Sequence, residues 1–212
     1  MFYSMRLFVL AYVVFVSAVT LLGPRPAVAQ VRDQLFFGVD VVYSRSNTIW
    51  QPLVAGATPD YSTALGPAGG LYAQYRRYYG NGVFVGGWAG VYASTAKGNL
   101  SFTEYENYRL GFNLDGQIGI SNGPSNWYVF AGWASAKVTL TDDGRSDTHQ
   151  LYGGSVGLGL EYNLSSVWSA GTQLRFTEYG SKTFDTGYLV DYKAREQSAR
   201  VYLSYKVWEG IR

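Results

Sequence analysis

Apolar and polar residues alternate one for one along much of the chain. Between Tyr108 and Ile120, one set of alternate positions carries Leu110, Phe112, Leu114 and Ile118, and the other carries Arg109, Gly111, Asn113, Asp115 and Gln117. A period of two residues is typical of a β-strand with one apolar and one polar face. The same alternation recurs over 150–163 and 198–207, so the pattern predicts a β protein.

Eight segments with this pattern are predicted to be strands: 35–44, 70–78, 83–94, 106–120, 127–140, 150–163, 167–179 and 197–208. Short gaps fall at 79–82, 121–126 and 164–166, and long gaps at 45–69, 95–105, 141–149 and 180–196. An even number of strands joined alternately by short periplasmic turns and long outer loops is typical of an outer-membrane barrel. The fold class predicted is all-β, an eight-stranded antiparallel up-and-down transmembrane β-barrel.

Charged residues within the predicted strands fall mainly on the face opposite the apolar one. In a membrane barrel the apolar face contacts lipid and the polar face lines the lumen, whereas a soluble ligand-binding barrel has the reverse arrangement. An eight-stranded interior is narrow enough for side chains to fill, and buried charges must pair. We therefore expect a plugging polar network in the lumen, made by Asp40, Arg76, Arg109, Asp115, Lys137, Glu161, Arg175, Arg200 and Lys206.

Aromatic residues gather beside the predicted short turns and near the C-terminal end. Tyr and Trp rings favour the membrane–water interface, where one part of the ring meets lipid and the other meets water. The expected interfacial aromatics are Tyr78, Tyr79, Trp127, Tyr128, Tyr162, Trp168, Tyr205 and Trp208. Residues 30–212 contain no run of apolar residues long enough for a membrane-spanning helix, which favours strands as the spanning elements.

The first 29 residues differ from the rest. Arg6 precedes an apolar run from Leu7 to Leu22, and Ala27-Val28-Ala29 supplies the small residues of a cleavage site. The run is shorter than the roughly 20 residues that span a bilayer. We interpret 1–29 as a cleaved signal peptide and 30–212 as the barrel domain. Arg6 and Arg25 account for the formal net charge of +2, so the mature chain is neutral and offers no basic surface for nucleic acid.

No catalytic or cofactor-binding constellation is evident. The only histidine, His149, follows a polar stretch and is interpreted as a solvated loop residue; Leu151 stands where a lipid A deacylase pattern requires serine. The acidic pair Asp142-Asp143 is interpreted as a solvated turn rather than as a cation site. There is no cysteine, so neither a disulfide framework nor lipoprotein acylation is available. We expect no enzymatic activity, no cofactor and no bound metal.

Several segments are similar to a known family. The segment 174–180 (LRFTEYG) resembles the R-Y-T-D-Y-G segment of the seventh strand in OmpA-like small barrels, and 36–40, 85–90 and 201–207 resemble other strands of that superfamily. The resemblance implies an eight-stranded outer-membrane surface barrel of the OmpA-like or Opa-like kind (a porin-like outer-membrane barrel domain). The usual final Phe is Val207 here, and 208–212 extends beyond it.

The leading functional hypothesis is a structural or surface-interaction barrel that supports the envelope or adheres through four extracellular loops. The expected contact surfaces are the 45–69 loop, with Trp50, Pro52 and Tyr61, and the 180–196 loop, with Phe184, Tyr188 and Tyr192. The expected partners are outer-membrane lipid and lipopolysaccharide, the barrel-assembly machinery, and host or surface ligands of the loops. Two alternatives stay open: a narrow porin-like channel for small solutes and, less favoured, a lipid A-modifying enzyme.

Overall fold

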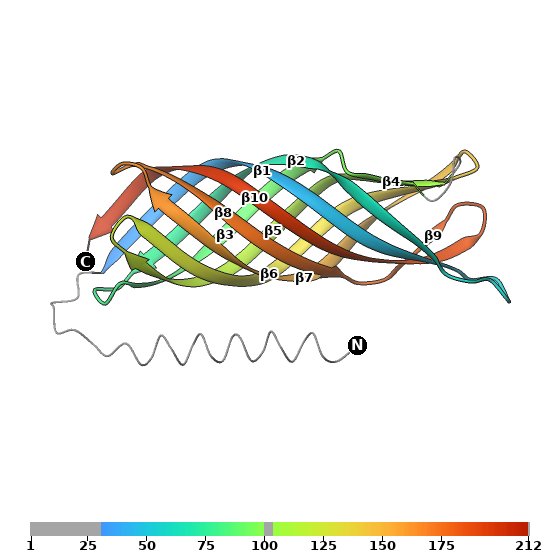
Figure 1. Cartoon of the computed structure of the whole chain (residues 1–212), viewed down its shortest axis with the longest axis horizontal. Coiled ribbons are helices and arrows are strands. Elements are labelled where there is room, and N and C mark those ends of the chain that lie inside the picture. The colour runs from blue at the N-terminus through green and yellow to red at the C-terminus, as the bar shows by residue number, and fades with distance from the viewer. Residues whose placement is uncertain (1–30, 100–103, 212) are drawn as a thin grey trace.

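One antiparallel sheet closes on itself to form a barrel in the computed structural model, which describes residues 31–99 and 104–211 (Figure 1). The strands are β1 (Arg32–Pro52), β2 (Asp60–Tyr78), β3 (Val83–Ser94), β4 (Lys97–Asn99), β5 (Tyr105–Asn122), β6 (Ser125–Asp142), β7 (Arg145–Asn163), β8 (Trp168–Tyr179), β9 (Lys182–Asp185) and β10 (Leu189–Ile211). The described part of the chain has no helix that could cross a membrane. The predicted signal peptide, 1–29, and Gln30 lie outside the described residues.

The ten strands occupy eight positions around the wall. β4 pairs with β2 and β5, which are also the neighbours of β3, and β9 pairs with β10, as β8 does. The two short strands therefore continue the lines of β3 and β8. The ring closes where β1 pairs with β10, from Arg32 opposite Ile211 to Pro52 opposite Val190. The predicted eight-stranded antiparallel barrel is confirmed.

The strands are staggered around the ring. A path of directly paired residues that leaves β1 at Phe36 returns to β1 at Ser46, after passing through Gln74, Trp88, Asp115, Gly132, Ser155, Thr177 and Glu196. This offset tilts the strands relative to the barrel axis, as Figure 1 shows. For eight strands, the resulting interior is just wide enough to be filled by side chains.

An apolar band encircles the outer wall. Val41, Leu71 and Val201 are 65%, 62% and 67% exposed, fractions that a soluble protein would rarely show on so many neighbouring strands. On β1 the band ends at Tyr43, and the next outward residues are Arg45 and Asn47. The exposed apolar side chains are the surface that lipid covers in an outer-membrane barrel.

The strands extend well beyond this band, and most of the predicted long loops are wrong. The 45–69 gap is a loop only over 53–59, and in the 180–196 gap β9 and the start of β10 leave only short connections. Above the band the pattern reverses: Arg45 points outward, whereas Trp50 is buried inside. Alternation with apolar residues on the outer face therefore identifies only the part of each strand that contacts lipid.

The 141–149 gap also contains strand, broken only by a two-residue turn. Asp143 and Gly144 have φ values of 44° and 80°, so both adopt the left-handed conformation of a type I′ hairpin turn. Asp-Gly is a strong signal for this turn, because Gly has no Cβ and Asp tolerates positive φ. The sequence therefore contained the information that β6 and β7 form a tight hairpin.

The lipid-facing band can be tested with two substitutions on β1. Val41→Arg places a charge at mid-band and should destabilise the folded barrel by about 2–4 kcal/mol, whereas Asn47→Arg, which lies above the band, should cost about 0–1 kcal/mol. Urea unfolding in lipid vesicles measures both. Equal costs at the two positions would contradict the assigned height of the band.

Candidate functional site

A buried ion pair lies inside the barrel near the end that holds the short turns. Arg76 donates from Nη2 to Glu161 Oε2 at 2.9 Å, and a second bond joins Arg76 Nη1 to Glu161 Oε1. Both side chains are completely buried. The guanidinium also lies over the rings of Phe84 and Tyr128, at 5.0 and 5.5 Å from their centroids. The lower lumen therefore holds a bidentate ion pair bordered by aromatic rings.

Two more ion pairs lie at mid-height in the lumen, one across it between β8 and β5, and one between the neighbouring strands β10 and β1. Arg175 Nη1 donates to Asp115 Oδ1 at 3.0 Å and to Ser155 Oγ at 2.7 Å. Arg200 Nε lies 3.4 Å from Asp40 Oδ2. Asn113 joins the two pairs, because its Nδ2 donates to Asp115 and its Oδ1 accepts from Arg200. The result is one hydrogen-bonded network made by β1, β5, β7, β8 and β10.

Aromatic rings separate the lower ion pair from the middle network. Tyr72 stacks on Trp88 with ring centroids 3.6 Å apart, and Tyr202 packs edge-on against both. The hydroxyls are also satisfied: Tyr72 bonds Ser204 at 2.6 Å, and Tyr202 bonds Tyr128 at 2.8 Å. These three rings form one packed cluster inside the barrel.

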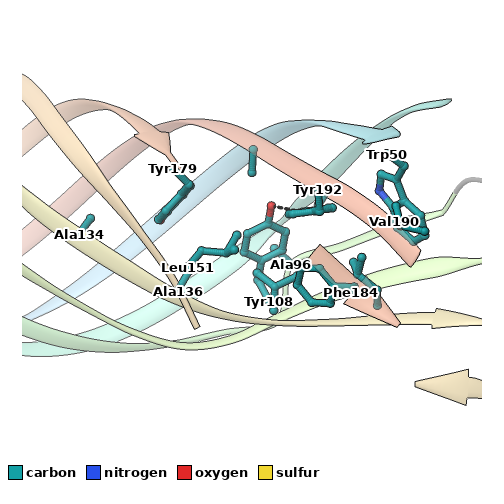
Figure 2. Packing of buried hydrophobic residues seen from close by; sticks show 14 residues of the cluster. Trp50, Ala96, Tyr108, Ala134, Ala136, Leu151, Tyr179, Phe184, Val190 and Tyr192 are labelled. Atoms are coloured by element: carbon teal, nitrogen blue, oxygen red, sulfur yellow. Dashed lines mark hydrogen bonds between the residues drawn. The ribbon is translucent and has the colours of Figure 1, made fainter. Parts of the chain in front are cut away.

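Above the middle network the interior becomes mainly apolar (Figure 2). The Tyr108 hydroxyl bonds both Ser46 Oγ and the Tyr192 hydroxyl at 2.7 Å. Tyr192 donates in turn to Glu106 Oε2 at 2.7 Å. Phe184 packs edge-on against Tyr192, with centroids 5.4 Å apart. A cavity of about 20 Å³, room for about one water molecule, lies between this cluster and Arg200.

The structure buries six of the nine residues expected in the lumen: Asp40, Arg76, Asp115, Glu161, Arg175 and Arg200. Lys206 lies at the short-turn mouth, where its side chain is 16% exposed and pairs with Glu209. It lines a polar pocket of about 360 Å³ together with Arg32 and Ser169. Arg109 and Lys137 are exposed on the outer wall, so their inward placement was wrong.

A β-bulge explains the error at Arg109. Tyr108 pairs with Val138 and Gly111 pairs with Ala136, so Arg109 and Leu110 both lie opposite Lys137. Strict alternation would place Arg109 inside, but the extra residue turns its side chain to the outer wall. Lys137 was misplaced for another reason: the inward residues of β6 here are Ala136, Val138 and Leu140, an apolar set that resembles a lipid-facing strand.

The expected interfacial aromatics divide between the two faces. Tyr78 and Tyr128 are buried, at 7% and 2% exposure, which corrects their assignment to the interface. Tyr78 is adjacent to Tyr79, and Tyr128 is adjacent to Trp127. Adjacent residues of a strand point to opposite sides, so only one residue of each pair can face the interface. Six are exposed and lie on strands or turns at the end with the short turns: Tyr79, Trp127, Tyr162, Trp168, Tyr205 and Trp208.

The expected loop contacts need a similar correction. Trp50, Phe184 and Tyr192 are at most 4% exposed and pack inside, so they are not surface contacts. Tyr61 and Tyr188 remain exposed at the tip. Burial and a hydrogen bond with Asp142 raise the pKa of Tyr188 to about 12. The sequence interpretation missed the other exposed apolar residues of the tip: Leu53, Val54 and Leu189.

His149 lies in β7 rather than in a loop. Its Nε2 is 3.0 Å from Asp147 Oδ2, which also accepts the backbone N–H of Asp185 at 2.8 Å, and its ring packs edge-on against Phe184. These contacts tie β7 to β9. Within residues 31–99 and 104–211, no group of three or more His, Cys, Asp or Glu is placed to hold a metal ion.

A family model for the outer membrane protein beta-barrel domain matches residues 15–206. No protein in the curated set matches. Among solved structures, the attachment invasion locus protein Ail of Yersinia pestis is 13% identical over 82% of this chain and 99% of its own, with a TM-score of 0.47. Neisserial surface protein A is 15% identical over 77% and 95%, with a TM-score of 0.44. The N-terminal β-barrel domain of Pseudomonas aeruginosa OprF is 15% identical over 78% and 96%, with a TM-score of 0.39.

The middle network makes a prediction about stability. Asp115→Ala leaves Arg175 buried without its carboxylate and should destabilise the barrel by about 3–5 kcal/mol. Adding Arg175→Met should recover part of that loss, because the unpaired charge is then gone. The matched control is Glu178→Ala, which removes an exposed pair with Arg195 and should cost about 0–1 kcal/mol. Urea unfolding of the four proteins gives the values, and a double variant no more stable than Asp115→Ala would contradict the pairing.

Proposed function

This chain belongs to the outer membrane protein beta-barrel domain family, and on that premise we propose that it is a closed surface barrel, which supports the outer membrane and contacts ligands through its loop end. The observation that carries the proposal is the filled interior. Arg76 with Glu161, Trp88 with its ring partners, and Arg175 with Asp115 occupy successive levels of the lumen. A lumen filled by paired charges and rings has no continuous path for solute.

We assign the end of the barrel opposite the short turns to the outside of the cell. Both described termini, Val31 and Ile211, lie at the end with the short turns (Figure 1). Outer-membrane barrels keep their short turns and chain ends in the periplasm. The opposite end then projects from the cell, and it carries the exposed apolar tip made by Leu53, Val54, Tyr61, Tyr188 and Leu189. Such a tip favours contact with an apolar or aromatic-binding surface rather than with a strongly charged one.

The remaining expectations about partners fit this proposal. Lipid and lipopolysaccharide would surround the apolar band, and the barrel-assembly machinery would insert the chain. Val207, which stands where the related barrels have a final Phe, is the unpaired residue of a bulge between β1 and β10. An enzymatic role receives no support from His149, whose contacts hold strands together. We propose a non-enzymatic protein.

The closed lumen predicts little or no ion flow. The purified protein in a planar bilayer should show no steady open state, because the three charged pairs and the ring stack leave no continuous water-filled path. Current recordings at fixed voltage measure this, with a wide porin in the same bilayer as the positive control. A large, stable conductance would reject the closed barrel and favour the channel.

The apolar tip predicts an effect on surface binding. Replacing Leu53, Val54 and Leu189 together by Ser should lower adhesion of intact cells to a target surface by about tenfold, because three apolar side chains no longer leave water on contact. The matched control is Leu164→Ser, at 59% exposure in a turn at the opposite end. Loss of adhesion with the control, or none with the triple variant, would argue against the tip as the contact surface.

A further inference from the structure

The β-bulge on β5 brings two cations face to face on the outer wall. Arg109 and Leu110 together lie opposite Lys137 of β6, and all three side chains are exposed. Residues directly opposite one another on antiparallel strands have their Cβ atoms roughly 5 Å apart. Like charges in that position destabilise a sheet, so the arrangement calls for a compensating negative charge.

No ion pair within the described residues supplies that charge. Among the pairs formed within 31–99 and 104–211, none includes Arg109 or Lys137. Two basic residues of β10 on the outer wall differ in this respect. Arg195 lies 3.1 Å from Glu178, and Lys193 lies 3.3 Å from the same carboxylate. The cations on β5 and β6 are therefore available to an external anion.

The position of Arg109 and Lys137 relative to the apolar band indicates what kind of anion they bind. Leu110 lies beside the two cations, and the next outward residues of β5 are Phe112 and Leu114; all three are part of the apolar band. On β6 the aromatic Trp133 is 51% exposed, and it contacts Tyr152 of β7 with ring centroids 5.6 Å apart. The cations thus stand at the upper edge of the lipid-facing surface, where lipid headgroups begin.

We propose that Arg109 and Lys137 form a clamp for a phosphate group of an outer-leaflet lipid, while Leu110 and the Trp133–Tyr152 pair contact its acyl chains. Arg supplies a planar fork of donors that can bind phosphate oxygens in pairs, and Lys adds a compact charge on the other side. These apolar side chains beside the two cations favour a lipid over a soluble anion. The choice of the outer leaflet rests on the orientation proposed above; the clamp itself depends only on the membrane position of the band.

The binding test compares the full mature protein with Arg109→Gln/Lys137→Gln. Both are purified in dodecyl maltoside, a phosphate-free detergent, and given diphosphorylated lipid A or its dephosphorylated form. Native mass spectrometry then measures the lipid retained. We expect the double variant to bind lipid A about thirty-fold more weakly, the change expected for two basic side chains at an anionic lipid surface. Binding of the dephosphorylated lipid should be the same for both proteins.

The matched control is Arg45→Gln/Arg195→Gln. It removes the same number of charges from adjacent strands at the same edge of the band, but Arg195 already has an acid as a partner. This variant should keep most of its lipid A binding. An equal loss in the two double variants would mean that overall charge, rather than the clamp, attracts the lipid, and would overturn the proposal.

Stability provides a second readout, which a merely structural role would not produce. In dodecyl maltoside alone, Lys137→Gln should raise the thermal midpoint, because it removes the repulsion with Arg109. With lipid A present, the same substitution should lower the midpoint relative to the wild type. If the substitution shifts the midpoint in the same direction with and without lipid A, the clamp is overturned. Stabilisation by inorganic phosphate as large as that by lipid A at equal concentration would overturn the assignment to a lipid. Neither result depends on the conductance or the adhesion of the protein.

Discussion

The pairing of β1 with β10 is the contact on which the rest of the structure depends. In a bilayer no water is present to bond a free backbone N–H or C=O, so a sheet can span it only if its two edge strands pair. Here the first and last strands pair over almost their full lengths. The stagger at which they meet fixes the tilt of every strand and the width of the interior. That width in turn determines which side chains can lie inside.

The charged interior follows from this narrow width. An arginine that points inward is buried away from bulk water, so it must find a counter-ion inside the lumen. Arg76 on β2 finds Glu161 on β7, and Arg175 on β8 finds Asp115 on β5. These pairs join strands that are not neighbours in the sheet. They therefore brace the barrel across its diameter, a direction in which backbone hydrogen bonds do not act.

The fold and most of the interior could be predicted from the sequence, because both depend on a single rule. Alternation identifies a strand wherever its outer face meets lipid, and it correctly assigns Asp40, Asp115 and Arg200 to the inside. The alternation rule does not apply where a bulge adds one residue, as at Arg109. The bulge depends on the pairing with the partner strand, and the sequence of β5 alone continues to alternate through it. The rule also fails above the membrane, where Trp50 and Phe184 are inside because water, not lipid, surrounds the wall. Asp143-Gly144 was recognisable as a turn. The sequence interpretation missed that such a tight turn requires β6 and β7 to extend as far as it.

The part of the wall above the apolar band sets how far the protein reaches. β1 continues as strand from Tyr43 to Pro52, and at about 3.3 Å per residue and a tilt near 45° this carries its end roughly 20 Å beyond the lipid. The packed cluster around Tyr108, Phe184 and Tyr192 keeps this section stiff. A flexible loop of the same length would have to be ordered each time it met a target, at a cost in entropy. A rigid column holds the tip at a constant distance from the bilayer instead, above the sugars closest to the membrane.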